Sequence, residues 1–333
     1  MGVAASGRAR QWGVPAGWAG TIVASGPRSL SEVAVQLPAS VSIREVGPRD
    51  GLQSEPPVPV DGRVRLVDAL SATGVGRIEV GSFVSPRAVP AMAGTDQVFA
   101  AIRRRPGVVY SALVPNRRGA EAALAAGAHQ LQVVVAASES YNKANVNRTV
   151  AETLDEIGGV VRLAGDTPVE ATVSTAWGCP YEGEVPPARV VGLAERLAGL
   201  GCRAVSLGDT TGMATPTRVE ALLAALAGRV PAVNCHFHDT RGTGLANLVV
   251  ALQAGCADVD TAVGGLGGSP TAPGAAGNVA SEDVVHMVED MGVTTGVDLD
   301  ALLAAARVAG ELVAHPLRSQ VLVAGPRTRR ASR

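Results

Sequence analysis

The stretch Val233-Asn234-Cys235-His236-Phe237-His238-Asp239 joins a short β-rich run to two histidines in alternate positions. On a strand, residues i and i+2 project from the same face, so these two imidazoles can share one metal ion. The competing interpretation is a pair of histidines that hydrogen bonds satisfy in a packed interior. Both this choice and the choice of fold depend on what the rest of the chain brings to the end of this strand.

Short β-rich runs alternate with longer helical patterns along most of the chain, and we count eight such units. Prolines or acidic residues mark helix starts before the patterns at 188–200, 217–226 and 284–291, and glycine follows most of the helical patterns. Eight βα units over about 250 residues match the size of a (β/α)8 TIM barrel. The predicted strands begin near Ser42, Arg77, Val108, Gln130, Val169, Ala204, Val233 and Val259.

Polar residues that are far apart in the chain fall at or just after the ends of predicted strands. In a TIM barrel the C-terminal ends of all the strands surround one site, whereas the first and seventh strands of an open sheet usually lie far apart. We therefore predict an α/β fold of the TIM-barrel type, with a doubly wound open sheet as the alternative. The residues that would converge in the barrel are Arg49, Asp50, His236, His238 and Asn278.

The converging residue types suit a divalent metal ion. Asp50, His236, His238 and Asn278 offer one carboxylate, two imidazoles and one amide oxygen, which leaves positions on a six-coordinate ion for a substrate that chelates through two oxygens. Such an ion acts as a Lewis acid on a hydroxyl or a carbonyl. Arg49, beside Asp50, can stabilise a developing enolate.

Two acidic residues are expected at the mouths of the second and sixth strands. Glu79 and Asp209 either orient metal ligands or pair with Arg49, and a structural ion pair with Asp50 or Glu79 is the alternative role for Arg49. The glycine-rich loop 264–278 lacks both GxGxxG and the P-loop lysine, so we exclude phosphate binding there. Its prolines indicate a shaped segment that can close over a substrate, with a flexible connector as the alternative.

Composition excludes several classes of protein. The 333 residues are 47% hydrophobic, and the four cysteines show no paired spacing, which favours free thiols in a reducing compartment such as the cytoplasm. The net charge of -1, with basic residues dispersed, predicts no nucleic-acid partner. No apolar run approaches the roughly 18 residues of a membrane-spanning helix, so no membrane partner is expected.

The two ends of the chain are expected to lie outside the barrel. Residues 1–40 contain three arginines and no acidic residue before Glu32, a composition typical of organellar transit peptides. They lack a clear amphipathic repeat, so we predict a flexible extension or a start placed too early. The catalytic barrel is expected to span 41–315 with a C-terminal helical extension, and 316–333 to form a loose tail.

Six motifs, occurring in this order, resemble those of hydroxymethylglutaryl-CoA lyase, within the wider group of TIM-barrel metallolyases. The resemblance extends from about Val41 to Leu312. The motifs are VGPRDGLQ at 46–53, SFVSP at 82–86, GCPYEG at 178–183, SLGDT at 206–210, HFHDT at 236–240 and the loop at 264–278.

This resemblance implies retro-Claisen cleavage of a 3-hydroxyacyl-CoA, foremost 3-hydroxy-3-methylglutaryl-CoA, to acetyl-CoA and acetoacetate. It implies Mg2+ or Mn2+ on the four ligands named above, Arg49 at the thioester oxygen of the enolate, and further catalytic roles for Glu79 and Asp209. Ser82 and Thr210 are expected to contact the substrate. Asp50, His236 or a bound water would accept the proton of the 3-hydroxyl. The resemblance also implies a homodimer that acts in leucine degradation.

Two departures from the family pattern bear on the substrate. Ser269 stands where the lyases carry a catalytic cysteine, and a serine hydroxyl is a far weaker acid than a thiol. Ser269 is expected either to protonate the enolate, directly or through water, or only to hold the loop. Glu170 and Thr172 replace an arginine and a tyrosine of the family, which would weaken recognition of a substrate carboxylate. The alternatives are therefore a lyase for another 3-hydroxyacyl-CoA or a 2-oxo acid, a Claisen-type synthase, and a non-catalytic barrel.

Overall fold

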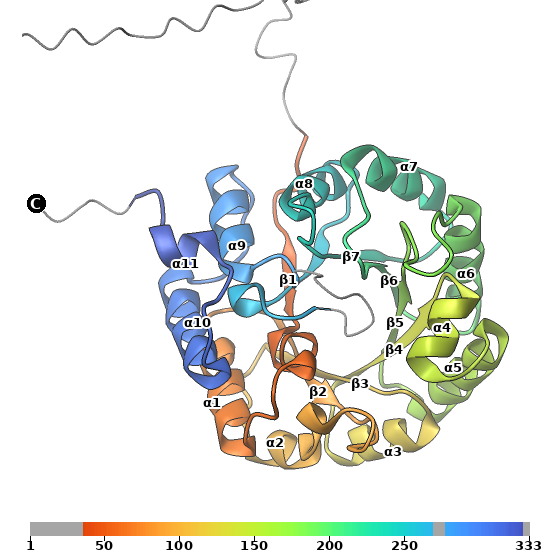
Figure 1. Cartoon of the computed structure of the whole chain (residues 1–333), viewed down its shortest axis with the longest axis horizontal. Coiled ribbons are helices and arrows are strands. Elements are labelled where there is room, and N and C mark those ends of the chain that lie inside the picture. The colour runs from red at the N-terminus through yellow and green to blue at the C-terminus, as the bar shows by residue number, and fades with distance from the viewer. Residues whose placement is uncertain (1–35, 269–276, 329–333) are drawn as a thin grey trace, which may run out of the picture. The chain divides into compact units, whose positions relative to one another are not determined.

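The computed structural model describes residues 36–268 and 277–328, and in it eight parallel strands close into a barrel (Figure 1). Each strand pairs with its neighbours in the chain, and the first pairs with the last through Ser42↔Asp258 to Glu45↔Thr261. This closure confirms the TIM barrel and excludes the open sheet. The strands are β1 (Ser42–Glu45), β2 (Arg77–Ser82), β3 (Val109–Leu113), β4 (Gln130–Ala136), β5 (Val169–Ser174), β6 (Ala204–Asp209), β7 (Val233–Phe237) and β8 (Asp258–Thr261).

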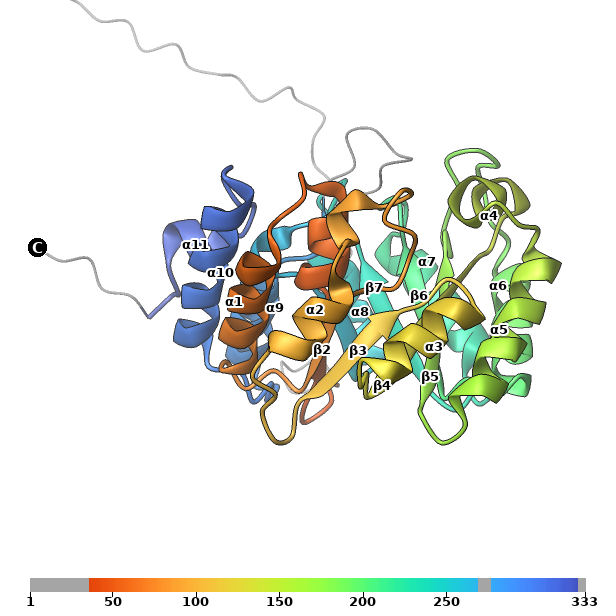
Figure 2. The ribbon, with the colours of Figure 1, turned by 90° about the horizontal axis from the view of Figure 1, so that it is seen from below.

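Helices form a ring around the barrel, and α10 packs against α1 at the side where the chain closes on itself (Figures 1 and 2). The three helices predicted from their proline and acidic starts are confirmed as α6, α7 and α9. The helices are α1 (Val60–Ser71), α2 (Thr95–Ala101), α3 (Arg117–Ala125), α4 (Glu139–Val146), α5 (Val150–Ala164), α6 (Pro187–Gly199), α7 (Pro216–Leu226), α8 (Gly244–Gln253), α9 (Ser281–Asp290), α10 (Leu299–Val313) and α11 (Gln320–Ala324).

Alternation along the strands divides the side chains between two environments. On β5, Val169, Ala171 and Val173 belong to the hydrophobic core, whereas Glu170 accepts a hydrogen bond from Arg44 on β1, across the barrel. Successive side chains of a strand point to opposite faces, so one set packs outward and the other fills the barrel. Arg44 and Glu170 therefore meet in the interior of the barrel, which is polar at this level.

The predicted C-terminal helical extension is present in α10, whereas α11 forms within 316–333, where a loose tail was expected. Asp283 on α9 accepts hydrogen bonds from Ser319 Oγ at 2.9 Å and from the backbone N–H of Val321 at 2.8 Å, which caps the start of α11 and ties it to the barrel. Within 36–268 and 277–328, no helix has the length and apolar character that crossing a membrane requires.

Candidate metal and catalytic site

The two histidines of the opening stretch converge with Asp50 at the C-terminal end of the barrel. His236 lies on β7 and His238 directly follows it, and their Nε2 atoms are 3.2 Å apart. Each of these nitrogens is 3.9 Å from Asp50 Oδ2, and ligand atoms of all three buried residues lie within 4.8 Å of one another. The structure therefore brings together the first and seventh strand ends, as a barrel should.

Asn278 joins this group from the segment after β8. The backbone of Asn278 pairs with that of His238 in an isolated antiparallel β-bridge. The Asn278 side chain donates through Nδ2 to Asp50 Oδ2 at 2.8 Å and to the Leu266 carbonyl at 3.0 Å. A Cβ at Gly267, which has φ +109°, would lie 2.6 Å from that Nδ2. Only glycine permits both this backbone conformation and this close approach.

The donor set fits a divalent cation. Asn278 Oδ1 and His238 Nδ1 are buried and have no hydrogen-bond partner among the described residues, although buried polar atoms normally have one. Burial disfavours ionisation of Asp50, but Arg49 and the two histidines outweigh it and lower its pKa to about 2. Burial, and then His236, lower the pKa of His238 to about 4. An ionised carboxylate, a neutral imidazole and a free amide oxygen are the states that metal binding requires.

Arg49 has both of the ion pairs that the sequence suggested. It lies in the turn Gly47–Gly51 that follows β1, and it donates to Glu79 through Nε at 2.8 Å and Nη2 at 3.1 Å. Its Nη1 donates to Asp50 Oδ1 at 2.5 Å, and Gln53 Nε2 donates to the same oxygen at 2.9 Å. Asp50 is thus oriented through Oδ1, while Oδ2 faces the histidines.

Two buried glutamates hold the backbone that carries these groups. Glu45 accepts hydrogen bonds from the N–H groups of Gly47 at 2.7 Å and Val263 at 2.9 Å, and burial raises its pKa to about 7. Glu282 accepts from the N–H of Gly264 at 2.9 Å, and burial raises its pKa to about 8. These contacts join the turn after β1 to the segment after β8.

Asp209 is placed differently from Glu79. Its Oδ1 accepts from the backbone N–H groups of Met213 at 2.7 Å and Ala214 at 3.0 Å, and its buried Oδ2 has no partner within the described part of the chain. Burial raises the pKa of Asp209 to about 6, against the opposing effects of those N–H groups and of the charge of His236. A carboxyl group with a free oxygen and a pKa near neutrality suits proton transfer.

The two predicted substrate contacts also lie at strand ends. Ser82 ends β2 and is buried, and its hydroxyl has no hydrogen-bond partner in 36–268 or 277–328. Thr210 follows β6, and its hydroxyl accepts from the N–H of Thr175, a residue at φ +56°. Ser269 lies outside the described residues.

Sequence reasoning missed the residues behind His236. Asp260 Oδ2 on β8 lies 3.1 Å from His236 Nδ1, and Arg44 donates to both oxygens of that carboxylate, at 2.9 and 2.6 Å. A signal was available, because Arg44 and Glu45 are consecutive charged residues on one predicted strand, and Asp258 and Asp260 alternate around Val259 on another.

Glu170 lies in the same polar layer of the barrel. Its Oε2 accepts from Arg44 Nη1 at 2.8 Å and from Asn234 Nδ2 at 3.2 Å, and its Oε1 lies 3.6 Å from Arg77 Nη1. The carboxylate of Glu170 is therefore compensated by two guanidinium groups.

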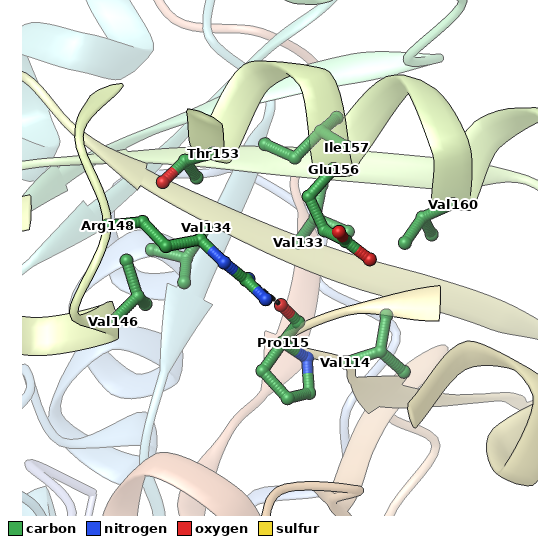
Figure 3. A pocket seen from close by; sticks show the side chains of 10 residues that line it. All are labelled: Val114, Pro115, Val133, Val134, Val146, Arg148, Thr153, Glu156, Ile157 and Val160. Carbon is green, nitrogen blue, oxygen red and sulfur yellow. Dashed lines mark hydrogen bonds between the residues drawn. The ribbon is translucent and has the colours of Figure 1, made fainter. Parts of the chain in front are cut away.

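A pocket elsewhere in the described part of the chain lacks this combination of groups. One pocket, between the ends of β3 and β4 and helix α5, is lined largely by Val114, Val133 and Val160, and Arg148 points across it and donates to the Pro115 carbonyl at 3.2 Å (Figure 3). The polar residues of this lining are Arg148, Thr153 and Glu156, and they form no group of metal ligands among the described residues.

The chain matches the family model described as HMGL-like over residues 40–309. A curated relative from Pseudomonas aeruginosa, named 3-hydroxy-3-isohexenylglutaryl-CoA/hydroxy-methylglutaryl-CoA lyase, is 47% identical over 274 residues, which cover 81% of this chain and 91% of the relative. The (R)-citramalyl-CoA lyase of Chloroflexus aurantiacus is 45% identical over 303 residues, covering 86% and 95%.

A solved structure gives the same similarity in three dimensions. It is described as an HMG-CoA lyase from Acinetobacter baumannii in complex with coenzyme A and 3-methylmalate. It matches this chain with a TM-score of 0.86 and 40% identity, over 88% of this chain and 98% of that one.

Proposed function

The chain belongs to the HMGL-like family and is a carbon–carbon lyase, and from this premise we propose that it cleaves 3-hydroxy-3-methylglutaryl-CoA to acetyl-CoA and acetoacetate. The observation that carries the proposal is the convergence of Asp50, His236 and His238 beside Arg49 at the C-terminal end of the barrel. A binding-only barrel has no need of such a cluster. The names of the relatives support the substrate class, an acyl-CoA with a 3-hydroxyl group.

Arg49 is proposed to stabilise the enolate that forms when the C2–C3 bond breaks. In this step the 3-hydroxyl loses its proton, a carbonyl forms at C3, and the bonding electrons pass to the thioester, whose oxygen becomes negative. Arg49 is held by Glu79 in a fixed orientation, with 13% of its side chain exposed. A preorganised cation at the developing charge is the arrangement that lowers such a barrier.

Asp209 is proposed as the acceptor of the 3-hydroxyl proton. The sequence suggested Asp50 or His236, but Asp50 is bonded through both oxygens, and the two ring nitrogens of His236 face Asp260 and His238. Asp209 instead has a free buried oxygen and a pKa of about 6. Protonation of the enolate at C2 then gives acetyl-CoA, and Ser269 is the proposed donor or the relay to a water.

Asp50, His236, His238 and Asn278 are the proposed ligands of a divalent ion, Mg2+ or Mn2+. When bound, such an ion supplies Lewis-acid polarisation of the substrate oxygens. The oxygen-rich part of the donor set favours these hard cations. We also propose a homodimer, as the resemblance implies, and a cytoplasmic location, as the unpaired cysteines favour; analytical ultracentrifugation would test the dimer.

The test is acetyl-CoA release from 3-hydroxy-3-methylglutaryl-CoA by the purified protein with Mg2+, followed by mass spectrometry with and without a chelator. We expect chelator-sensitive turnover of about 1 per second or more. Citramalyl-CoA and a 3-hydroxyacyl-CoA without a distal carboxylate serve as comparison substrates. Absence of turnover by a metal-loaded protein would refute the proposed substrate, and absence of metal binding would refute the site itself.

A further inference from the structure

We propose that Asp260, clamped by Arg44, is a positioning residue that fixes the tautomer and the ring orientation of His236, so that its Nε2 lone pair faces the metal position. The inference rests on the metal site proposed above, and it assigns a role to two buried residues that take no part in the chemistry described so far. It starts from a contact between neighbouring strands of the barrel.

The hydrogen bond between His236 and Asp260 has a defined direction. His236 and Asp260 are register partners on β7 and β8, and Asp260 Oδ2 lies 3.1 Å from His236 Nδ1. An ionised carboxylate can only accept hydrogen bonds, so the proton of a neutral imidazole must stand on Nδ1. The Nε2 atom then carries the lone pair, and Nε2 is the nitrogen that faces His238 and Asp50.

The Asp260 carboxylate is itself held in one orientation. Arg44 donates through Nε to Asp260 Oδ1 at 2.9 Å and through Nη2 to Oδ2 at 2.6 Å, which is a two-point contact between planar groups. Its remaining Nη1 donates to Glu170 at 2.8 Å, which leaves the guanidinium little freedom to rotate. Arg44 is 1% exposed and Asp260 2%, so water does not compete for these bonds.

A second arginine–aspartate pair lies in the same polar layer and serves as a comparison. Arg77 on β2 donates to Asp258 on β8 at 2.5 Å, and Arg77, like Arg44, lies near Glu170. Asp258 has no contact with a histidine among the described residues, and its side chain is 38% exposed. The two pairs therefore differ in the feature that matters, which is contact with a proposed ligand.

The carboxylate–imidazole–metal arrangement is known to raise the basicity of the ligand and to hold its ring in place. Loss of such an outer partner typically weakens metal binding by about 10- to 100-fold. We therefore expect Asp260→Ala to weaken Mn2+ binding by about that factor. The matched variant Asp258→Ala removes an ion pair of the same kind and should leave Mn2+ affinity unchanged.

The decisive readout does not need the metal. In metal-free protein labelled with 15N-histidine, the ring nitrogens of His236 should report an Nδ1–H tautomer, assigned by the loss of its signals in His236→Ala. Asp260→Ala should abolish that fixed tautomer, and Asp258→Ala should preserve it. A residue that only supported the fold would lower stability without moving the tautomer.

Asp260→Ala leaves Arg44 buried without its main partner, which is strongly destabilising. The double variant Arg44→Met/Asp260→Ala removes both charges, and it is expected to show the same change of tautomer and the same loss of Mn2+ affinity. An unchanged His236 tautomer in both variants would overturn the proposal, as would an equal loss of Mn2+ affinity in Asp258→Ala. A wild-type protein that binds no Mn2+ would refute the metal site, while the tautomer would still decide the role of Asp260.

Discussion

Replacing Arg49 by methionine separates its electrostatic role from its structural one. The guanidinium makes three hydrogen bonds, two to Glu79 and one to Asp50, and all of them would be lost. Removal of one preorganised donor to an oxyanion typically lowers kcat by about 100- to 1000-fold. Asp50 would keep its bonds to Gln53 and Asn278, so we expect Arg49→Met to retain its metal.

Arg49→Met also leaves the buried carboxylate of Glu79 without its ion-pair partner. The side chain of Glu79 is 1% exposed, and breaking a buried ion pair by removing one partner costs about 3–5 kcal/mol of unfolding free energy. The double variant Arg49→Met/Glu79→Gln should recover much of that stability but none of the turnover. Arg77→Met removes the ion pair between Arg77, at the start of β2, and Asp258. We expect it to lower stability with little effect on kcat.

Three measurements distinguish these effects: the steady-state rate of acetyl-CoA release, urea unfolding, and calorimetric titration with Mn2+. The expected result is a large loss of kcat in both Arg49 variants, with Mn2+ affinity near that of the wild type. If either variant turned over within a few-fold of the wild-type rate, the enolate role of Arg49 would be wrong. If Mn2+ binding vanished with activity, Arg49 would instead be required to position Asp50.

Three further substitutions test other parts of the site. His236→Ala should reduce Mn2+ affinity at least 10-fold by calorimetry, whereas His286→Ala, on α9, should not. The pKa of Glu282 is raised from 4.5 to about 8, so the unfolded chain ionises first and stability falls as pH rises between these values. Urea unfolding at several pH values should show that Glu282→Gln flattens this slope. Ser269→Cys should raise the rate of 3-hydroxy-3-methylglutaryl-CoA cleavage if the serine limits protonation of the enolate; an unchanged rate would locate the limitation elsewhere.

The barrel was predictable because its information is local. The short β-rich runs and the glycine that follows most of the helical patterns are visible in the sequence without any knowledge of long-range contacts. The convergence of Asp50, His236 and His238 then followed from topology alone, since every parallel strand of a closed barrel ends at the same face. Boundaries moved by only about one residue at α6 and α7.

The contacts inside the barrel were not predictable, because they depend on which side chains meet across it. Arg44 and Asp260 are separated by 216 residues, and no spacing rule connects them. The same holds for the choice between Glu79 and Asp209, which looked equivalent as acidic residues at strand ends. Only the structure distinguishes a carboxylate paired with Arg49 from one that retains a free buried oxygen.

Glu170 illustrates why charge in a sequence differs from charge in a site. A carboxylate in place of an arginine suggested weaker recognition of a substrate carboxylate, but Arg44 and Arg77 both approach Glu170, at 2.8 and 3.6 Å. With Asp258 and Asp260 included, the layer has two positive and three negative groups, so Glu170 is one member of a largely compensated cluster. Discrimination between acyl-CoA substrates is then expected to involve other groups as well. The Ser82 hydroxyl, which has no hydrogen-bond partner among the described residues, and Ser269, which stands at the cysteine position of the family motif, are the first to test.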